Sequence, residues 1–257
     1  MMPAIIRPVY LMVAALCLTA SLTGCATTNP ILPPEVPAMH SLSEVTDERV
    51  VMTPDPWYGF NRGMYKFNYN LDKYVLLPVV NGYEFITPTF VQTGVSNFFN
   101  NIGEIRNLTN NLFQLKGKDS LITLGRFATN STIGIAGLFD PATSLGMERK
   151  IEDFGQTLGY WGTGTGNYVV LPLFGPSNVR DTGGLVVDSA IHAGIKAAID
   201  PLGNAENGDA ILMGATLLNA IDKRHSEKFR YNGSDYPFEY DMVRWLAGEK
   251  RKLEVMK

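Results

Sequence analysis

The chain has 257 residues and a formal net charge of −3 at pH 7, from 22 basic and 25 acidic side chains. A balance this close to neutral gives no reason to expect nucleic acid as a partner. Charged residues make up 18% of the chain, below the roughly 25% of a typical soluble domain. Together with the generous glycine and aromatic content, this scarcity of charge favours contact with lipid.

The N-terminus has the features of a bacterial lipoprotein signal peptide. Residues 9–22 form a mostly apolar run without a charge. This run is shorter than the roughly 20 residues that a membrane-crossing helix needs, and it has the length of a secretory h-region. The sequence Leu22-Thr23-Gly24-Cys25 then matches the lipobox pattern. We therefore expect residues 1–24 to be removed and Cys25 to carry a diacylglycerol and an acyl chain, the alternative being an ordinary signal peptide with a chance cysteine.

The residues around Cys25 indicate where the mature chain resides and what chemistry it lacks. Ala26 follows the cysteine, and the absence of an aspartate there favours the outer membrane. Cleavage removes Cys17 and acylation uses Cys25, which excludes disulfides, thiolate metal sites and cysteine nucleophiles. Residues 25–54 are rich in proline, so we expect an extended tether.

Residues 88–115 give the clearest helix pattern. Apolar side chains recur there every three or four residues and so form one stripe, whereas the opposite face carries amides. Glu104 and Arg106 are the only charges between residues 89 and 115. An uncharged amide face fits a crowded or headgroup-level setting, where ionic groups are costly to desolvate, and it equally fits a helix packed inside the protein on both faces. The amides of this face are Asn97, Asn100, Asn101, Asn107, Asn110 and Asn111.

The remaining pattern predicts a mainly helical body. A second helix is expected to begin with Asp119 or Ser120 as its cap and to end around residues 134–137. A turn at residues 138–141 follows it. A third helix is expected over residues 185–199 and a fourth over residues 209–230, where Asp209 caps the start and basic residues lie near the end. A shorter amphipathic segment follows Pro237, and the fold class is predicted to be all-α.

A narrow polar stripe runs along the expected helix 185–199. Asp188, His192 and Lys196 lie at positions i, i+4 and i+8, so they share one side of a helix that is otherwise mostly apolar. The stripe has two interpretations. It lines a path for polar groups, or it is satisfied against neighbouring helices.

The sequence contains no convincing catalytic or metal site. Gly162, Gly164 and Gly166 resemble a phosphate-cradling loop, but residue 167 is Asn and the segment before the loop is helical, so a tight turn is favoured. The three histidines lack ligand partners at suitable spacing. No serine lies in a nucleophile elbow. We expect neither an enzyme, nor a cofactor, nor a bound metal.

Several stretches together resemble the MlaA (VacJ) lipoproteins. The resemblance covers about residues 55–188, keeps the order and spacing of the family motifs and agrees with the lipobox. The first stretch is Asp55-Pro56-Trp57-Tyr58-Gly59-Phe60-Asn61-Arg62, the second includes Gly137-Leu138-Phe139-Asp140-Pro141-Ala142, and the third is Glu152-Asp153-Phe154-Gly155-Gln156-Thr157-Leu158-Gly159.

The resemblance implies a ring-shaped helical bundle embedded in the inner leaflet of the outer membrane. Such a protein would remove mislocalised phospholipids from the outer leaflet through an amphipathic channel. It would pass them to a periplasmic, MlaC-like carrier and would associate with trimeric porins. The body is expected over residues 55–232 and the C-terminal amphipathic segment over residues 233–257.

Two hypotheses about residues follow from this resemblance. Asp188, His192 and Lys196 are candidates to line the channel, and Gly159, Gly162, Gly164 and Gly166 are candidates for a flexible loop beside it. The competing function is a structural lipoprotein that scaffolds porins without moving lipid. A through-channel with an apolar wall and a polar rim would favour transport, whereas a solid bundle would favour scaffolding.

Overall fold

The computed structural model describes residues 53–199, 208–231 and 237–257. All of them lie in one compact unit, Pro37–Lys257. The expected signal peptide, the lipidated Cys25 and the tether up to residue 52 fall outside the described residues. The expected boundary between body and C-terminal segment, at residue 233, falls in the second gap.

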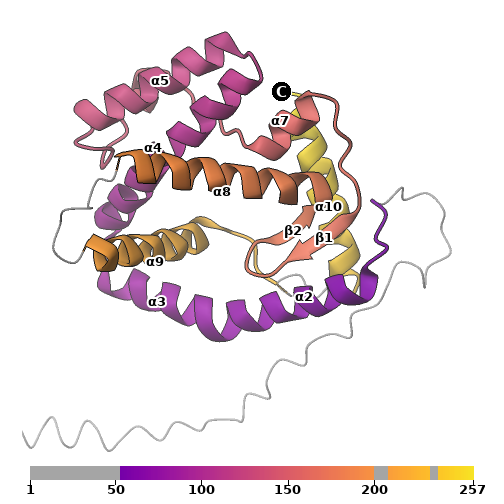
Figure 1. Cartoon of the computed structure of the whole chain (residues 1–257). Helices are drawn as coiled ribbons and strands as arrows, with labels where there is room; N and C mark the ends of the chain where they lie inside the picture. The colour runs from indigo at the N-terminus through magenta and orange to yellow at the C-terminus, as the bar shows by residue number, and fades with distance from the viewer. Residues whose placement is uncertain (1–52, 200–207, 232–236) are drawn as a thin grey trace, which may run out of the picture. The chain divides into compact units, whose positions relative to one another are not determined.

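The described part is predominantly α-helical, as predicted (Figure 1). One boundary follows directly from a proline. Thr87 is extended because Pro88 follows it, and this separates the helix that ends at Ile86 from the helix that begins at Thr89. The elements in order are α2 (Tyr58–Leu71), η2 (Asp72–Leu76), α3 (Leu77–Ile86), α4 (Thr89–Phe113), α5 (Gly117–Thr132), α6 (Pro141–Ser144), α7 (Phe154–Tyr160), β1 (Tyr168–Leu171), β2 (Gly175–Asn178), α8 (Val179–Ile199), α9 (Gly208–Ser226) and α10 (Glu239–Val255).

Two of the predicted helix starts were wrong. The α5 helix begins two residues before the predicted cap, and the Ser120 hydroxyl donates back to the Lys116 carbonyl instead of capping. The α8 helix begins six residues earlier than predicted. The Asn178 side chain accepts a hydrogen bond from the Asp181 backbone N–H at 2.9 Å, and an asparagine in this role is a strong helix start.

The sequence analysis also missed a small β-hairpin. Strands β1 and β2 pair antiparallel, with Tyr168 opposite Asn178 and Leu171 opposite Gly175. The turn between them needs positive φ at Leu173 (+69°) and Gly175 (+76°). Each strand has only four residues, too few for an alternating pattern to be recognised.

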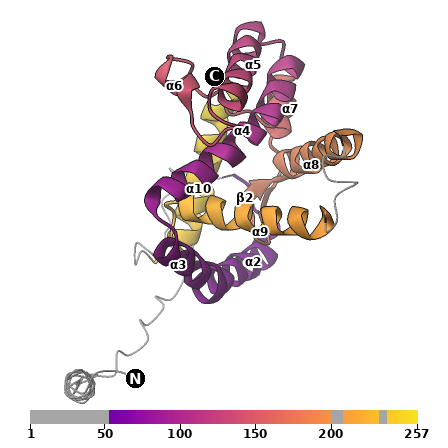
Figure 2. The same cartoon turned by 90° about the vertical axis from the view of Figure 1, so that its left-hand side faces the viewer.

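Contacts between elements close a circuit within the described unit. From α2 the circuit runs through η2 and α3 to α9, on through α4 and α7 to α8, and back through β2 and β1 to α2. Figures 1 and 2 show these elements from two directions. The α5 helix packs on α4, and α10 contacts both α7 and β2. The circuit brings residues that are far apart in the sequence around one central region.

A small aromatic cluster joins the two ends of the described chain. Tyr65 of α2 and Tyr240 of α10 are each about 1% exposed, and their rings meet edge-on with centroids 5.6 Å apart. Tyr168 of β1 packs against the same ring at 6.2 Å. The Tyr65 hydroxyl also donates a hydrogen bond to Glu239. The C-terminal helix is therefore packed into the same core as the first described helix.

The α4 helix buries most of its polar face more deeply than its apolar stripe, which is half-buried along most of its length and exposed at its end. Asn107, Asn110 and Asn111 are fully buried, whereas Leu112 is 56% and Leu115, just beyond the helix end, is 88% exposed. Asn101 is buried as well, but Asn97 is half-buried and Asn100 is exposed, so the amide face packs largely inside the protein. The buried amides find hydrogen-bond partners on α5, α7 and α8.

This inversion extends over the described residues as a whole. Buried polar side chains far outnumber buried apolar ones, the reverse of a typical water-soluble domain. Large apolar side chains are instead exposed on almost every helix, and contiguous exposed apolar surface marks contact with protein or membrane. Examples are Phe60, Phe67, Tyr74, Phe85, Phe90, Leu121, Leu124, Ile135, Phe139, Trp161, Phe174, Val186, Met213, Leu217 and Leu253.

Candidate functional site

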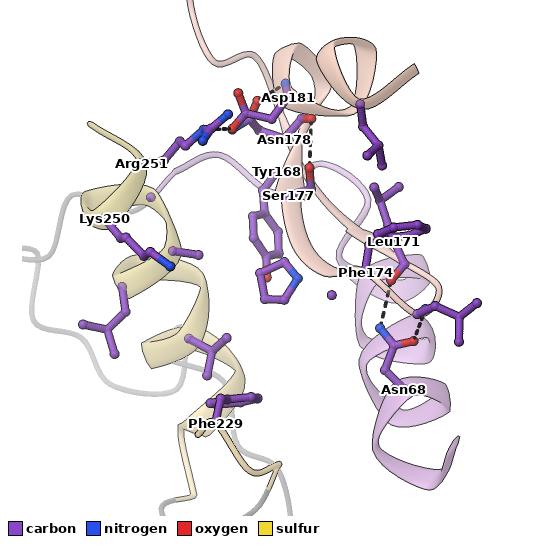
Figure 3. A pocket seen from close by; sticks show the side chains of 18 of the residues that line it. Asn68, Tyr168, Leu171, Phe174, Ser177, Asn178, Asp181, Phe229, Lys250 and Arg251 are labelled. Atoms are coloured by element: carbon purple, nitrogen blue, oxygen red, sulfur yellow. Dashed lines mark hydrogen bonds and ion pairs between the residues drawn. The ribbon is translucent and has the colours of Figure 1, made fainter. Parts of the chain in front are cut away.

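A cavity of about 720 Å³ lies among the elements of the contact circuit. Residues of α2, η2, α4, both strands, α8, α9 and α10 line it. One part of its wall is apolar and another is charged. Figure 3 shows the hairpin between α2 and α10 at this cavity. The apolar lining residues include Leu71, Leu76, Leu171, Leu173, Phe174, Leu185, Phe229, Val243 and Leu246.

Two buried asparagines of α2 hold the hairpin that forms one wall. Asn61 donates to the Tyr168 carbonyl at 3.1 Å and accepts from the Val170 N–H at 2.8 Å. Asn68 repeats the pattern three residues further along the hairpin, with the Leu171 carbonyl and the Leu173 N–H, both at 2.9 Å (Figure 3). Each amide thus satisfies the strand edge as a neighbouring strand would. The hairpin is therefore firmly positioned against α2.

A charge cluster closes the end of the cavity formed by α10. Arg251 donates to Asp181 at 2.7 Å and to both carboxylate oxygens of Asp153. Burial disfavours the guanidinium charge, but the hydrogen bonds that Arg251 donates to Asp153 and Asp181 outweigh this effect and raise the pKa of Arg251. Desolvation raises the pKa of Asp153, but the Arg251 hydrogen bonds lower it overall. Both groups are charged at neutral pH, and α10 is pinned to α7 and α8.

A second ion pair lies on the opposite side of the cavity. Arg224 of α9 donates to both carboxylate oxygens of Asp72 in η2, one of these bonds being 2.8 Å long. Hydrogen bonding to the Asp72 carboxylate raises the pKa of Arg224. A bidentate pair of this kind fixes geometry as well as charge. It holds α9 against η2.

The predicted polar stripe of α8 is divided by the structure. Asp188 is buried and lines the cavity. It accepts hydrogen bonds from the Asn110 amide at 3.0 Å and from the Phe154 backbone N–H at 2.9 Å. His192 is exposed and is not among the cavity-lining residues. Lys196 lies in α8, but its side chain is outside the described part of the chain.

The predicted glycine loop is shorter than expected. Gly159 lies in α7, where a Cβ would come within 2.7 Å of the Arg180 guanidinium, so its role is close packing rather than flexibility. Gly162, Gly164 and Gly166 do lie in the connection from α7 to β1. Thr165 in this connection lines the cavity, and its carbonyl accepts from the Arg180 N–H. The prediction that the loop is flexible remains a prediction.

A buried ionic network supports the outer side of α4, and the sequence analysis missed it. Arg126 of α5 donates to Glu104 at 3.0 Å and to Asp140 at 3.0 Å. Desolvation by itself would raise the pKa of Asp140, but hydrogen bonds from Thr143, Arg126 and Asn130 lower it to about 2. The available signal was Glu104, one of two charges in a long uncharged helix. The network joins α4, α5 and α6.

The described residues contain no group of three or more histidine, cysteine or acidic side chains placed to hold a metal ion. Among these residues there is also no helix that combines the length and the hydropathy required to cross a membrane. The described residues form a cavity with apolar and charged lining residues. Their buried side chains are mostly polar, and many large apolar side chains are exposed.

The chain resembles known proteins along most of its length. Residues 53–254 match the family model described as MlaA lipoprotein. The Haemophilus influenzae protein named intermembrane phospholipid transport system lipoprotein MlaA is 33% identical over 180 residues, which are 68% of this chain and 65% of that protein. The Escherichia coli K12 protein of the same name is 36% identical over 138 residues, 52% of this chain and 55% of the relative.

A relative without a named function and a solved structure extend the comparison. An uncharacterised Rickettsia typhi protein is 36% identical over 171 residues, 66% of this chain and 65% of its own length. The matched segments therefore cover 65% of the Haemophilus influenzae and Rickettsia typhi proteins and 55% of the Escherichia coli protein. A chain solved in work on the structural basis for maintenance of bacterial outer membrane lipid asymmetry superposes with a TM-score of 0.60 at 32% identity, over 78% of this chain and 98% of that one. This chain belongs to the MlaA lipoprotein family.

Proposed function

We propose that this protein is a lipid-anchored outer-membrane protein that takes mislocalised phospholipid from the outer leaflet through an amphipathic channel. It passes the lipid to a soluble, MlaC-like periplasmic carrier and so maintains lipid asymmetry. Relatives named for intermembrane phospholipid transport support the substrate class. The single observation that carries the proposal is the amphipathic cavity inside the circuit of contacting elements.

The inverted distribution of side chains supports a body embedded in one leaflet. Hydrocarbon cannot hydrogen-bond to polar groups, so a protein surrounded by lipid must satisfy them internally. Asn107 and Asn110 of α4 meet this requirement through hydrogen bonds made by both amide atoms, and the exposed Leu112, Phe113 and Leu115 present an apolar surface. In this proposal Cys25 directs the chain to the membrane, and the exposed apolar side chains hold it there.

The cavity also favours transport over the alternative of a porin scaffold. A scaffold needs an outer binding surface but no internal space, whereas a phospholipid needs an apolar wall for its chains and a polar region for its headgroup. Leu171, Phe174 and Leu185 supply the first, and the charged and polar side chains elsewhere in the lining supply the second. Association with a trimeric porin remains part of the proposal as a means of holding the protein in place.

A pair of tryptophan substitutions on one helix tests the proposal. Leu185 lines the cavity, whereas its neighbour Val186 is exposed and is not among the lining residues. Cells lacking the protein should accumulate phospholipid in the outer leaflet. Leu185→Trp, which fills the cavity, should fail to complement the deletion, and Val186→Trp should complement it. If both variants complement fully at equal abundance, the cavity does not carry lipid and the scaffold function is favoured.

A further inference from the structure

The charged groups of the cavity are almost all neutralised by partners within the described residues. Arg224 pairs with Asp72, and Arg251 pairs with Asp153 and Asp181. Lys250 and Lys252 lie against glutamates of their own helix. A cation that already has a close carboxylate partner gains little from a second anion.

Arg106 of α4 differs from these four cations. It lines the cavity, yet within the described part of the chain its guanidinium has no ion pair and no hydrogen-bond partner. Its Nε is buried and unsatisfied. Leaving a buried donor of a charged group unpaired costs free energy, so a group that supplies an acceptor in the cavity would be bound favourably.

The acids around Arg106 are already engaged. Asp153 is near enough for its pKa to be lowered by Arg106, but both of its carboxylate oxygens bond to Arg251. Asp188, the other acid of this part of the cavity, is held by Asn110 and the Phe154 N–H. Neither carboxylate turns to pair with Arg106.

We propose that Arg106 is the phosphate-binding residue of the cavity and receives the phosphodiester of a phospholipid. The inference rests on the proposed function and specifies its substrate contact. A guanidinium presents a planar fork of donors that matches two phosphate oxygens. The apolar lining at Leu171, Phe174 and Leu185 then accommodates the acyl chains.

Lipid binding to the full-length protein in a neutral maltoside detergent tests the assignment. The probes are phosphatidylglycerol, diacylglycerol with the same acyl chains, and inorganic phosphate. Arg106→Ala should weaken phosphatidylglycerol binding about ten- to a hundredfold, as expected for loss of hydrogen bonds to a charged group, and should leave diacylglycerol binding unchanged. Arg106→Lys should restore part of the loss. Lys252→Ala, which removes a paired cation from the same cavity, is the matched control and should bind like the wild type.

The outcomes separate this inference from the proposed function. If the wild type binds neither lipid, the proposed function fails. If it binds both lipids and Arg106→Ala changes neither, or weakens both equally, lipid binding stands and the phosphate assignment is overturned. If inorganic phosphate binds as tightly as phosphatidylglycerol and displaces it, the site serves free phosphate and not a lipid. Because Arg106 has no described partner to lose, its variants should melt at the wild-type temperature, and Arg106→Gln serves as a second variant for this comparison.

Discussion

Asn110 on α4 joins Asp188 on α8 to Thr157 on α7. Its amide nitrogen donates to Asp188 at 3.0 Å, and its amide oxygen accepts from the Thr157 hydroxyl at 2.8 Å. Asn110→Leu makes the helix more apolar, yet it should destabilise the protein by about 2–5 kcal/mol. It removes one of the two donors of the buried Asp188 carboxylate, which keeps only the Phe154 N–H, and it removes the acceptor of the Thr157 hydroxyl. Thermal unfolding in detergent measures the change.

Leu112→Ala provides the control for this experiment, since Leu112 lies on the same helix and is more than half exposed. We expect this variant to change stability by less than about 1 kcal/mol. A larger loss for Leu112→Ala than for Asn110→Leu would contradict the inverted arrangement of α4.

Two adjacent glycines at the start of α8 should respond in opposite ways to alanine. A Cβ on Gly184 would lie 2.3 Å from the Gly155 backbone nitrogen, whereas a Cβ on Gly183 would meet nothing within 4 Å. Gly184→Ala should therefore force α7 and α8 apart and cost about 1–3 kcal/mol or more. Gly183→Ala should stabilise the helix by up to about 1 kcal/mol. Unfolding midpoints of the two variants decide the matter, and equal midpoints would refute the close contact.

The buried network around Arg126 should be one of the most sensitive points of the fold. Arg126→Ala removes the cation that Glu104 and Asp140 share. Glu104 keeps a second cation, Arg149, at 3.3 Å, so we expect a cost of about 3 kcal/mol, the lower end of the roughly 3–5 kcal/mol for breaking a buried pair. Lys150→Ala removes a cation that is paired only with the exposed Glu148, and its cost should be at most about 1 kcal/mol. Expression level and unfolding temperature report both effects. Equal behaviour of the two variants would show that the network does not support α4.

Asp140 predicts a specific acid sensitivity. Its pKa is lowered from 3.8 to about 2 in the folded protein, so the carboxylate stabilises the fold above about pH 4, and this stabilisation is lost as the pH falls toward 2. Because Asp140 is partly solvent-accessible, the contribution should be on the order of 1 kcal/mol. Asp140→Asn should be less stable than the wild type at pH 7, and the difference should narrow between pH 4 and pH 2. A difference that stays constant over this range would contradict the assignment.

The sequence was sufficient to predict the helices but not the direction in which they face. Periodicity placed a helix over residues 88–115, and α4 spans Thr89–Phe113. The spacing of apolar residues shows only that one face of a helix is more apolar than the other. Which face is buried depends on the surroundings, because lipid reverses the preference that water imposes. The buried role of Asn110 therefore became apparent only from its partners on α7 and α8.

The sequence predicted a residue of the cavity only where the spacing of neighbouring polar residues placed them on one helix face. Asp188 was singled out from the i, i+4 stripe and does line the cavity, whereas the same spacing included the exposed His192. Arg106 was visible as one of two charges in its helix but could not be assigned a role, because the absence of a partner is a property of the fold. The hairpin depends on Asn61, which lies more than 100 positions before the strand it holds.

The aromatic cluster has a consequence for how the chain acquires its structure. Tyr65 and Glu239 are 174 positions apart in sequence, so their hydrogen bond closes almost the whole described chain into one loop. Contacts of such high sequence separation slow folding, because the entropy of closing the loop is lost before the contacts form. The core cannot be completed until residue 240 has been synthesised. Until then the exposed apolar side chains are not held on a completed fold, which makes the emerging chain prone to aggregate.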